Sequence, residues 1–103
     1  MKKLVWTDPA VEDLRELYAY IARDSELYAS GFVQRLISAT ERLVDHAEMG
    51  RVVPESNNDS IRELLYQNYR IIYRLKDDQV EVLSVIHGAR DLGGRSAVPW
   101  DVS

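Results

Sequence analysis

The seven residues Tyr69–Leu75, "YRIIYRL", decide the fold because they alternate between two kinds of side chain. Successive side chains of an extended strand point to opposite faces. One face of such a strand carries Tyr69, Ile71, Tyr73 and Leu75, and the other carries Arg70, Ile72 and Arg74. The first face is typical of a hydrophobic core. The segment therefore predicts a strand in a sheet whose second face carries arginine.

Two further segments with strand character flank this one. "IRELLY" (61–66) precedes it across Gln67-Asn68, which we expect to form a two-residue hairpin turn. "VEVLSVIH" (80–87) follows it across the turn "KDDQ" (76–79). Its β-branched, mostly apolar composition is typical of a central strand. The three segments predict an antiparallel meander.

Upstream of the strands, the hydrophobic period becomes helical. After a short strand at 2–6, Asp8 is expected to cap a first helix with Pro9 in its first turn. Ser25 is expected to cap a second helix that ends near His46 to Met49, with Gly50 as its C-terminal stop. Asp13 falls on the polar face of the first helix. The apolar stripes are Val11, Leu14, Leu17, Tyr18 and Ile21 in the first helix, and Ala29, Phe32, Val33, Leu36, Ile37, Thr40, Leu43 and Val44 in the second.

The order of these elements predicts one α+β domain over residues 1–103, with the order β-α-α-β-β-β and a C-terminal tail at 93–103. Two amphipathic helices with a short link form an antiparallel hairpin. The hairpin can bury its stripes against only one face of a small antiparallel sheet. The other sheet face is then expected to be open and to carry Arg70 and Arg74.

Composition narrows the possible functions. The 103 residues include 13 Lys and Arg, 17 Asp and Glu and no Cys, for a net charge of −4. Proteins that bind nucleic acid usually carry an excess of basic residues, which this chain lacks. No direct sequence-specific DNA binding is therefore expected. Without Cys, and with only His46 and His87 at unsuitable spacing, neither a metal nor another cofactor is expected. No apolar run reaches the ~18 to 20 residues of a membrane span, and no signal peptide is visible, so a cytoplasmic protein without a membrane partner is expected.

Several ionisable groups are expected to converge on the open face. If the side of the last strand that holds Ile86 meets the helices, His87 points to the open face beside Arg70. Glu63 joins Arg70 across the hairpin. The neighbouring loop and the segment after the last strand add Arg51, Glu55 and Arg90. Alternatively, these arginines form only a solvated face, in ion pairs that each contribute about 0 to 1 kcal/mol.

Five short motifs extend this interpretation to a family. They are "WTDPAVEDL" (6–14), "GRVVPE" (50–55), "REL" (62–64), "YRIIY" (69–73) and "HGARD" (87–91). In this order they resemble the RelE/ParE superfamily of toxins from bacterial type II toxin–antitoxin systems, from Leu4 to about Leu92. The last motif resembles the ParE branch more closely. The resemblance implies two helices on a small antiparallel sheet, and a cognate antitoxin as partner.

The superfamily contains two function classes. RelE-like members cut mRNA in the ribosome, and ParE-like members poison DNA gyrase by protein–protein contact. RNA cleavage needs a general base, a general acid and a cation for the phosphorane charge. In one RelE-like branch these groups are a Glu, an Arg, a His and a Tyr that follows the His. Glu55, Arg70 and His87 match the Glu, the Arg and the His. Gly88 stands where that branch has the Tyr.

The net charge and the last motif favour gyrase inhibition, with no catalytic residue in this chain. An mRNA endoribonuclease that uses Glu55, Arg70 and His87 is the alternative, and an inactive or regulatory binding module is a third interpretation. Under the favoured one, the residues that bind partners are Arg51, Arg62, Arg70, Arg74, His87, Arg90 and Trp100.

Arginine suits a protein partner because its planar guanidinium binds carboxylates through two hydrogen bonds. We expect acidic groups of the antitoxin to lie against Arg62, Arg70, Arg74 and Arg90. In the tail, Gly93-Gly94 is a possible hinge. Trp100 is then expected either to contact the target or to fold back onto the helices.

Overall fold

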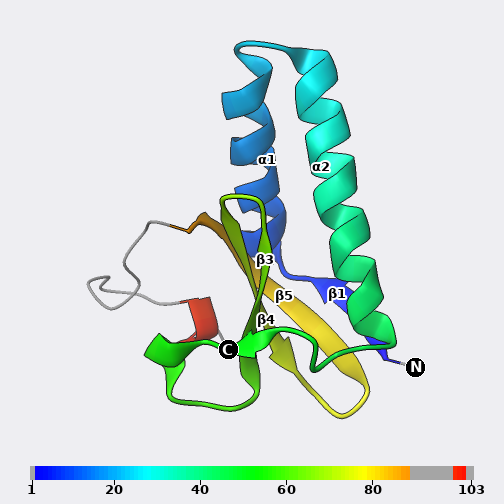
Figure 1. The fold of residues 1–103 in the computed structure, drawn as a ribbon, viewed down its shortest axis with the longest axis vertical. Helices are drawn as coiled ribbons and strands as arrows, with labels where there is room; N and C mark the ends of the chain where they lie inside the picture. Colours follow the sequence, from blue (N-terminus) through cyan, green and yellow to red (C-terminus); the bar gives the residue numbers. More distant parts are fainter. Residues whose placement is uncertain (1, 89–98, 102–103) are drawn as a thin grey trace.

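The computed structural model describes residues 2–88 and 99–101 and arranges them in two layers, a helical hairpin and a sheet (Figure 1). The hairpin consists of α1 (Asp8–Ala22) and α2 (Glu26–Glu41), whose distal ends extend beyond the sheet. The strands are β1 (Lys3–Trp6), β2 (Arg51–Val52), β3 (Ile61–Tyr66), β4 (Tyr69–Leu75) and β5 (Gln79–His87). Three short 3-10 helices are η1 (Arg42–Val44), η2 (Pro54–Ser56) and η3 (Pro99–Asp101). Within these described residues, no helix is long and apolar enough to cross a membrane.

The predicted α+β class, the meander β3-β4-β5 and the turn at Gln67-Asn68 are confirmed. The sheet is mixed, however, because β1 pairs with β5 in parallel, and its strand order is β1-β5-β4-β3-β2. A long connection through both helices separates β1 from β5, so no tight turn forces an antiparallel pairing. The segment after Gly50, for which no strand was predicted, contributes the edge strand β2.

Helix ends were predicted only in part. Ser25 caps α2 by accepting the N–H of Tyr28 at 3.1 Å, as expected. The cap of α1 is Thr7 rather than Asp8, because the Thr7 hydroxyl accepts the N–H of Ala10 while it donates to the Val82 carbonyl of β5. Thr7 thereby ties the start of the helix to the sheet.

The prediction that the second helix ends near Gly50 was wrong, because α2 ends at Glu41 and continues only as η1. Gly50 lies instead against the sheet. A Cβ atom there would be 2.5 Å from the Glu63 carbonyl oxygen and 2.5 Å from the Tyr73 hydroxyl. Glycine is therefore required for a close approach and does not act as a helix stop.

The main core lies between the hairpin and one sheet face. Its buried members include Leu17 and Leu36 from the helices and Ile71 from β4, and Tyr69 packs against them. Tyr73 is buried in a neighbouring cluster beside Leu43. The predicted helix-facing side of β4 is thus confirmed.

The opposite sheet face is not open as expected. A second core of Val53, Ile61, Ile72, Leu83 and Ile86 lies there, and Trp100 packs against it. The segment after β2 and the short helix η3 supply the cover. Trp100 therefore folds back, but onto the sheet face away from the helices rather than onto the helices.

A β-bulge in β5 explains a second wrong prediction. Tyr73 pairs with Val82 while Ile72 pairs with Ser84, so one residue is inserted and the alternation of faces is inverted beyond it. Ile86 consequently lies in the second core, away from the helices. His87 pairs with Tyr69 and lies on the helix side of the sheet end rather than beside Arg70.

Candidate functional site

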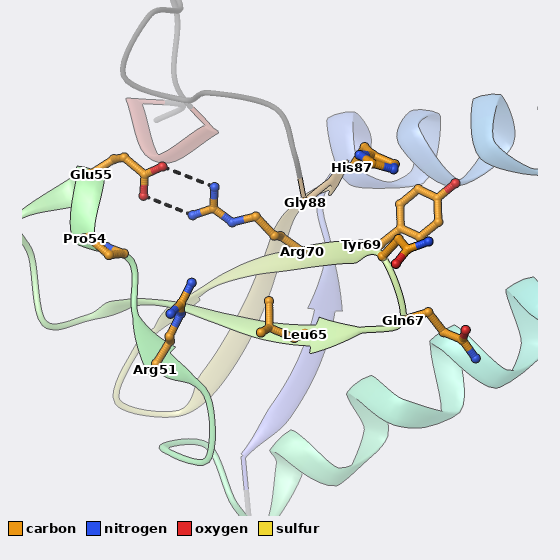
Figure 2. Close-up of a pocket in the computed structure, with 10 residues that line it drawn as sticks. Arg51, Pro54, Glu55, Leu65, Gln67, Tyr69, Arg70, His87 and Gly88 are labelled. Atoms are coloured by element: carbon orange, nitrogen blue, oxygen red, sulfur yellow. Dashed lines mark hydrogen bonds and ion pairs between the residues drawn. The ribbon is translucent and has the colours of Figure 1, made fainter.

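A pocket of about 610 Å³ opens at the end of the sheet where the β3–β4 turn and the end of β5 meet (Figure 2). Residues from β2, η2, β3, β4 and β5 line it. They are Arg51, Pro54, Glu55, Leu65, Gln67, Asn68, Tyr69, Arg70, His87 and Gly88. The pocket therefore contains four of the residues that the sequence singled out: Arg51, Glu55, Arg70 and His87.

Beneath the pocket, a buried carboxylate joins two arginines. The Glu63 side chain is 0% exposed and accepts hydrogen bonds from Nε of Arg51 and, at 2.5 Å, from Nε of Arg70. Pairing between β2 and β3 sets Arg51 directly opposite Glu63. Burial of this charge is tolerable because both carboxylate oxygens are paired.

The outer side of the Arg70 guanidinium is occupied by Glu55. Its two terminal nitrogens donate to the two Glu55 carboxylate oxygens at 3.2 and 3.0 Å (Figure 2). These hydrogen bonds lower the pKa of Glu55, and they raise the pKa of Arg70. The short helix η2 presents Glu55, and the chain leaves it through Asn57 in the left-handed conformation with φ 52°.

These four residues, Arg51, Glu63, Arg70 and Glu55, form an ion cluster whose formal charges cancel. The Arg70 side chain is only 8% exposed and Glu55 is 27% exposed, whereas Arg51 is 63% exposed. The expected row of free guanidinium groups is therefore absent from this part of the described structure. In the cluster, Arg51 presents the cation most accessible to a partner.

His87 lies at the pocket rim and points away from the cluster. Its ring meets Tyr69 edge-on, with centroids 5.6 Å apart, whereas Arg70 extends toward Glu55 (Figure 2). Tyr69 in turn packs edge-on against Phe32, and burial raises its pKa. The structure thus brings Glu55 and Arg70 together but directs His87 to the aromatic cluster on the helix side.

Gly88 closes the pocket beside the β3–β4 turn. Its N–H donates to the Asn68 carbonyl at 2.7 Å, and a Cβ atom would lie 3.2 Å from the Asn68 oxygen. A tyrosine at this position, as in the ribonuclease branch, would require the turn to shift by a few tenths of an ångström.

The remaining residues predicted to bind partners are scattered. Arg74 lies on the face away from the helices, 3.9 Å from Glu81, and donates to the Trp100 carbonyl. Arg62 pairs with Tyr73 and so lies on the helix side, where it donates to the Gly50 carbonyl at 3.0 Å. Arg62 therefore does not share a face with Arg70 and Arg74. Arg90 and Gly93-Gly94 lie outside the described residues.

Two features of this region could not be predicted from the sequence. Glu63 was expected beside Arg70 on the open face, but it is buried, with 1% of its surface exposed. Asp13 was placed on the polar face of the first helix, yet it accepts hydrogen bonds from the Ser84 hydroxyl at 2.7 Å and the Val85 N–H at 3.0 Å. The bulge that brings these donors to Asp13 leaves no trace in the hydrophobic period.

Comparison with known proteins connects this geometry to a family. A family model described as the ParE toxin of the type II toxin–antitoxin system, parDE, matches residues 4–92. The chain belongs to this ParE toxin family. The resemblance to the RelE/ParE superfamily is thereby confirmed, and membership of a toxin–antitoxin family implies an antitoxin partner.

Other ParE-family and RelE/ParE-type proteins resemble this toxin to different degrees. "Toxin RelE2" of Caulobacter vibrioides is 33% identical over 91 residues, which cover 87% of this chain and 99% of the relative. The structure "Chromosomal ParDE TA system from P. aeruginosa" matches with a TM-score of 0.71 and 24% identity, over 84% of this chain and 96% of the other. The Staphylococcus aureus YoeB dimer structure matches with a TM-score of 0.51 and 16% identity, over 84% and 95%. Both structures show that the fold is shared.

Proposed function

We propose that this ParE-family toxin inhibits DNA gyrase in the cytoplasm by protein–protein contact, without catalysis of its own, until its antitoxin neutralises it. The observation that carries the proposal is the closed ion pair between Glu55 and Arg70, with His87 directed away from both. The residues that match a ribonuclease site are present, but they are engaged elsewhere.

The chemistry of RNA cleavage explains why this arrangement argues against a nuclease. A general base works best with a pKa near the operating pH, whereas the hydrogen bonds from Arg70 lower the pKa of Glu55. A cation for the phosphorane must point at the phosphate. Arg70 instead directs its Nε to Glu63 and both terminal nitrogens to Glu55.

Charge supports the same proposal. A nuclease that docks on ribosomal RNA gains affinity from basic residues that neutralise phosphates. This chain carries a net charge of −4. The match of residues 4–92 to the ParE toxin family model supports a ParE-type target.

A ribosome-dependent mRNA endoribonuclease is the second candidate. The observation in its favour is that Glu55, Arg70 and His87 line one pocket, so a rearrangement of η2 would release both members of the ion pair toward a substrate. Under this alternative, His87→Ala abolishes activity, whereas a gyrase inhibitor has no need of the imidazole as a general acid.

Two assays on the purified toxin distinguish the candidates. One measures the cleaved DNA that accumulates with gyrase, and the other measures mRNA cut on programmed ribosomes. We expect the first signal and not the second, for the wild type and for His87→Ala alike. Cleavage of ribosome-bound mRNA that disappears in His87→Ala would overturn the proposal.

We further propose that Arg51 binds a carboxylate of the antitoxin, because it is the exposed arginine of the ion cluster. Arg74 is proposed to bind a further carboxylate of the antitoxin, and Trp100 to contact the target, at the far end of the covered face. Arg51→Ala should weaken antitoxin binding about fivefold, the effect of losing one exposed ion pair. Arg15→Ala on α1, which is exposed and outside the pocket, is the control.

A further inference from the structure

Strand β5 extends farther than its neighbour β1. The parallel pairing covers only Gln79–Val82, because the chain leaves β1 at Trp6 and enters α1 through Thr7. Beyond this point, within the described residues, no strand pairs with the outer edge of residues 84–86. Exposed strand edges are templates for pairing with another chain unless the protein covers them.

The backbone direction at this edge follows from two hydrogen bonds. The Val85 N–H donates outward to Asp13, and the Gly88 N–H donates inward to Asn68 at the β3–β4 turn. The N–H and C=O of one strand residue point to the same side, so the Val85 carbonyl also faces outward. Asp13 thus accepts the hydrogen bond of the Val85 N–H at this edge, and the Val85 carbonyl beside it remains as an acceptor.

A groove of about 450 Å³ runs along this edge. Its walls are one stripe of α1 and the second half of β5, and its lining is Asp13, Glu16, Leu17, Tyr20, Tyr69, Ser84, Val85, Ile86 and His87. Leu17 is buried, whereas the Tyr20 side of the groove is open, with that residue 67% exposed. The groove therefore offers an apolar wall to a side chain that enters it.

The groove is also acidic. Asp13 and Glu16 line it, and no Lys or Arg does. Glu16 forms no ion pair within residues 2–88 and 99–101, whereas the neighbouring Glu12 is paired with Arg15. A cationic side chain that entered along the edge would meet Glu16 beside Asp13.

We propose that the groove between α1 and the free edge of β5 binds an extended peptide segment of a protein partner that presents Lys or Arg between apolar residues. The segment adds to β5 as a strand and donates a backbone N–H to the Val85 carbonyl. Residues two apart share a face of a strand, so a basic residue can lie at Glu16 while its apolar neighbours cover Leu17 and Tyr20. This surface shares Tyr69 and His87 with the ion-cluster pocket but is otherwise lined by other residues, and the proposal does not depend on which target the toxin inhibits.

Short peptides provide the probe. We would titrate the 15N-labelled toxin by NMR with acetyl-Ser-Leu-Thr-Lys-Thr-Leu-Ser-amide, with its Lys→Glu form, and with a form N-methylated along one edge. At about 1 mM peptide, the Lys form should shift the amide signals of Ser84–Ile86 and of Glu16. The Glu form should bind about tenfold more weakly, since a repulsion replaces an exposed ion pair. The N-methylated form should lose the shifts at Val85, because it cannot donate to the carbonyl.

Two toxin variants complete the test. Glu16→Lys should reverse the preference between the Lys and Glu peptides, while Glu41→Lys, an equal charge change on exposed α2, should leave it unchanged. Thermal unfolding of each variant verifies that the fold is retained. Equal binding of the two peptides, shifts that map elsewhere, or no shift at 84–86 would each overturn the proposal.

Discussion

Arg70 and Glu55 are 15 positions apart in the sequence and are joined by two hydrogen bonds, of 3.2 and 3.0 Å. The pair lies on the outer side of the ion cluster and connects η2 to β4. It also places the guanidinium that a nuclease would need in contact with the carboxylate that the nuclease would use as its base. This one contact therefore links the stability of the loop to the proposed absence of catalysis.

Removal of the buried carboxylate should be costly. Glu63→Gln leaves Arg70 with one fewer charged partner in a site where it is 8% exposed, so we expect the free energy of unfolding to fall by about 3 kcal/mol. Urea denaturation measures the change. The control is Glu81→Gln. Glu81 lies 3.9 Å from Arg74 and 3.3 Å from Lys76, and these ion pairs are nearer the surface, so the expected loss is below about 1 kcal/mol. Equal losses in the two variants would show that burial of Glu63 is unimportant.

Stability should depend on pH through Glu55. Its pKa in the folded toxin is lower than in the unfolded chain because Arg70 hydrogen-bonds the carboxylate. Between the pKa of the folded state and the pKa of the unfolded state, the unfolded chain therefore binds more protons. The stabilisation by Glu55 is complete above the pKa of the unfolded state and is lost as pH falls through the pKa of the folded state. Urea denaturation from pH 6 to about pH 3 should show this decline. Glu55→Gln should flatten it, and an unchanged slope in that variant would contradict the assignment.

Two glycines should respond oppositely to alanine. Gly50→Ala places a Cβ 2.5 Å from the Glu63 carbonyl oxygen, a backbone atom that cannot rotate away, and should destabilise the fold by about 2 to 3 kcal/mol. Gly31→Ala in α2 meets only the flexible end of Arg35, at 3.0 Å, and should stabilise by about 0.5 to 1 kcal/mol. Thermal unfolding of both variants tests the contrast, and a loss of stability in Gly31→Ala would be the contrary result.

Trp100 should contribute to folding as well as to any partner contact. Its side chain packs on the second core, so Trp100→Ala should reduce stability by about 2 kcal/mol, while the main-chain carbonyl that accepts a hydrogen bond from Arg74 is retained. Leu27→Ala, at a residue 86% exposed, should change it by less than about 0.5 kcal/mol. If Trp100→Ala removes growth inhibition while its unfolding curve stays that of the wild type, the side chain acts in target contact alone.

Much of the fold follows from local pattern. The alternation in Tyr69–Leu75 correctly assigns its two faces, since the side-chain period of a strand depends only on backbone geometry. Ser25 correctly marks the start of α2, because a cap needs only the residues of the next turn. The motif order correctly indicates the toxin superfamily.

The errors share a cause, which is contact between residues far apart in sequence. A single inserted residue in β5 reverses the faces of Ile86 and His87, and the alternation cannot reveal it because both strand faces are apolar there. Arg62 pairs with Tyr73 and so lies on the helix side, as the alternation along residues 61–66 requires once Glu63 shares a face with Arg70.

The sequence by itself determined the two helices, the strands β1, β3, β4 and β5, their order, the helix-facing side of β4 and the family, because these depend on periodicity, capping and short motifs. Only the tertiary structure decided that Arg70 is buried between Glu63 and Glu55, that β1 runs parallel to β5, and that, within residues 2–88 and 99–101, no strand pairs with β5 beside Asp13. Burial of a charge and exposure of a strand edge depend on what the rest of the chain places over them. The segment after Gly50 and the short helix η3 supply that cover on one face, and the early end of β1 leaves residues 84–86 without a strand partner at the outer edge among the described residues.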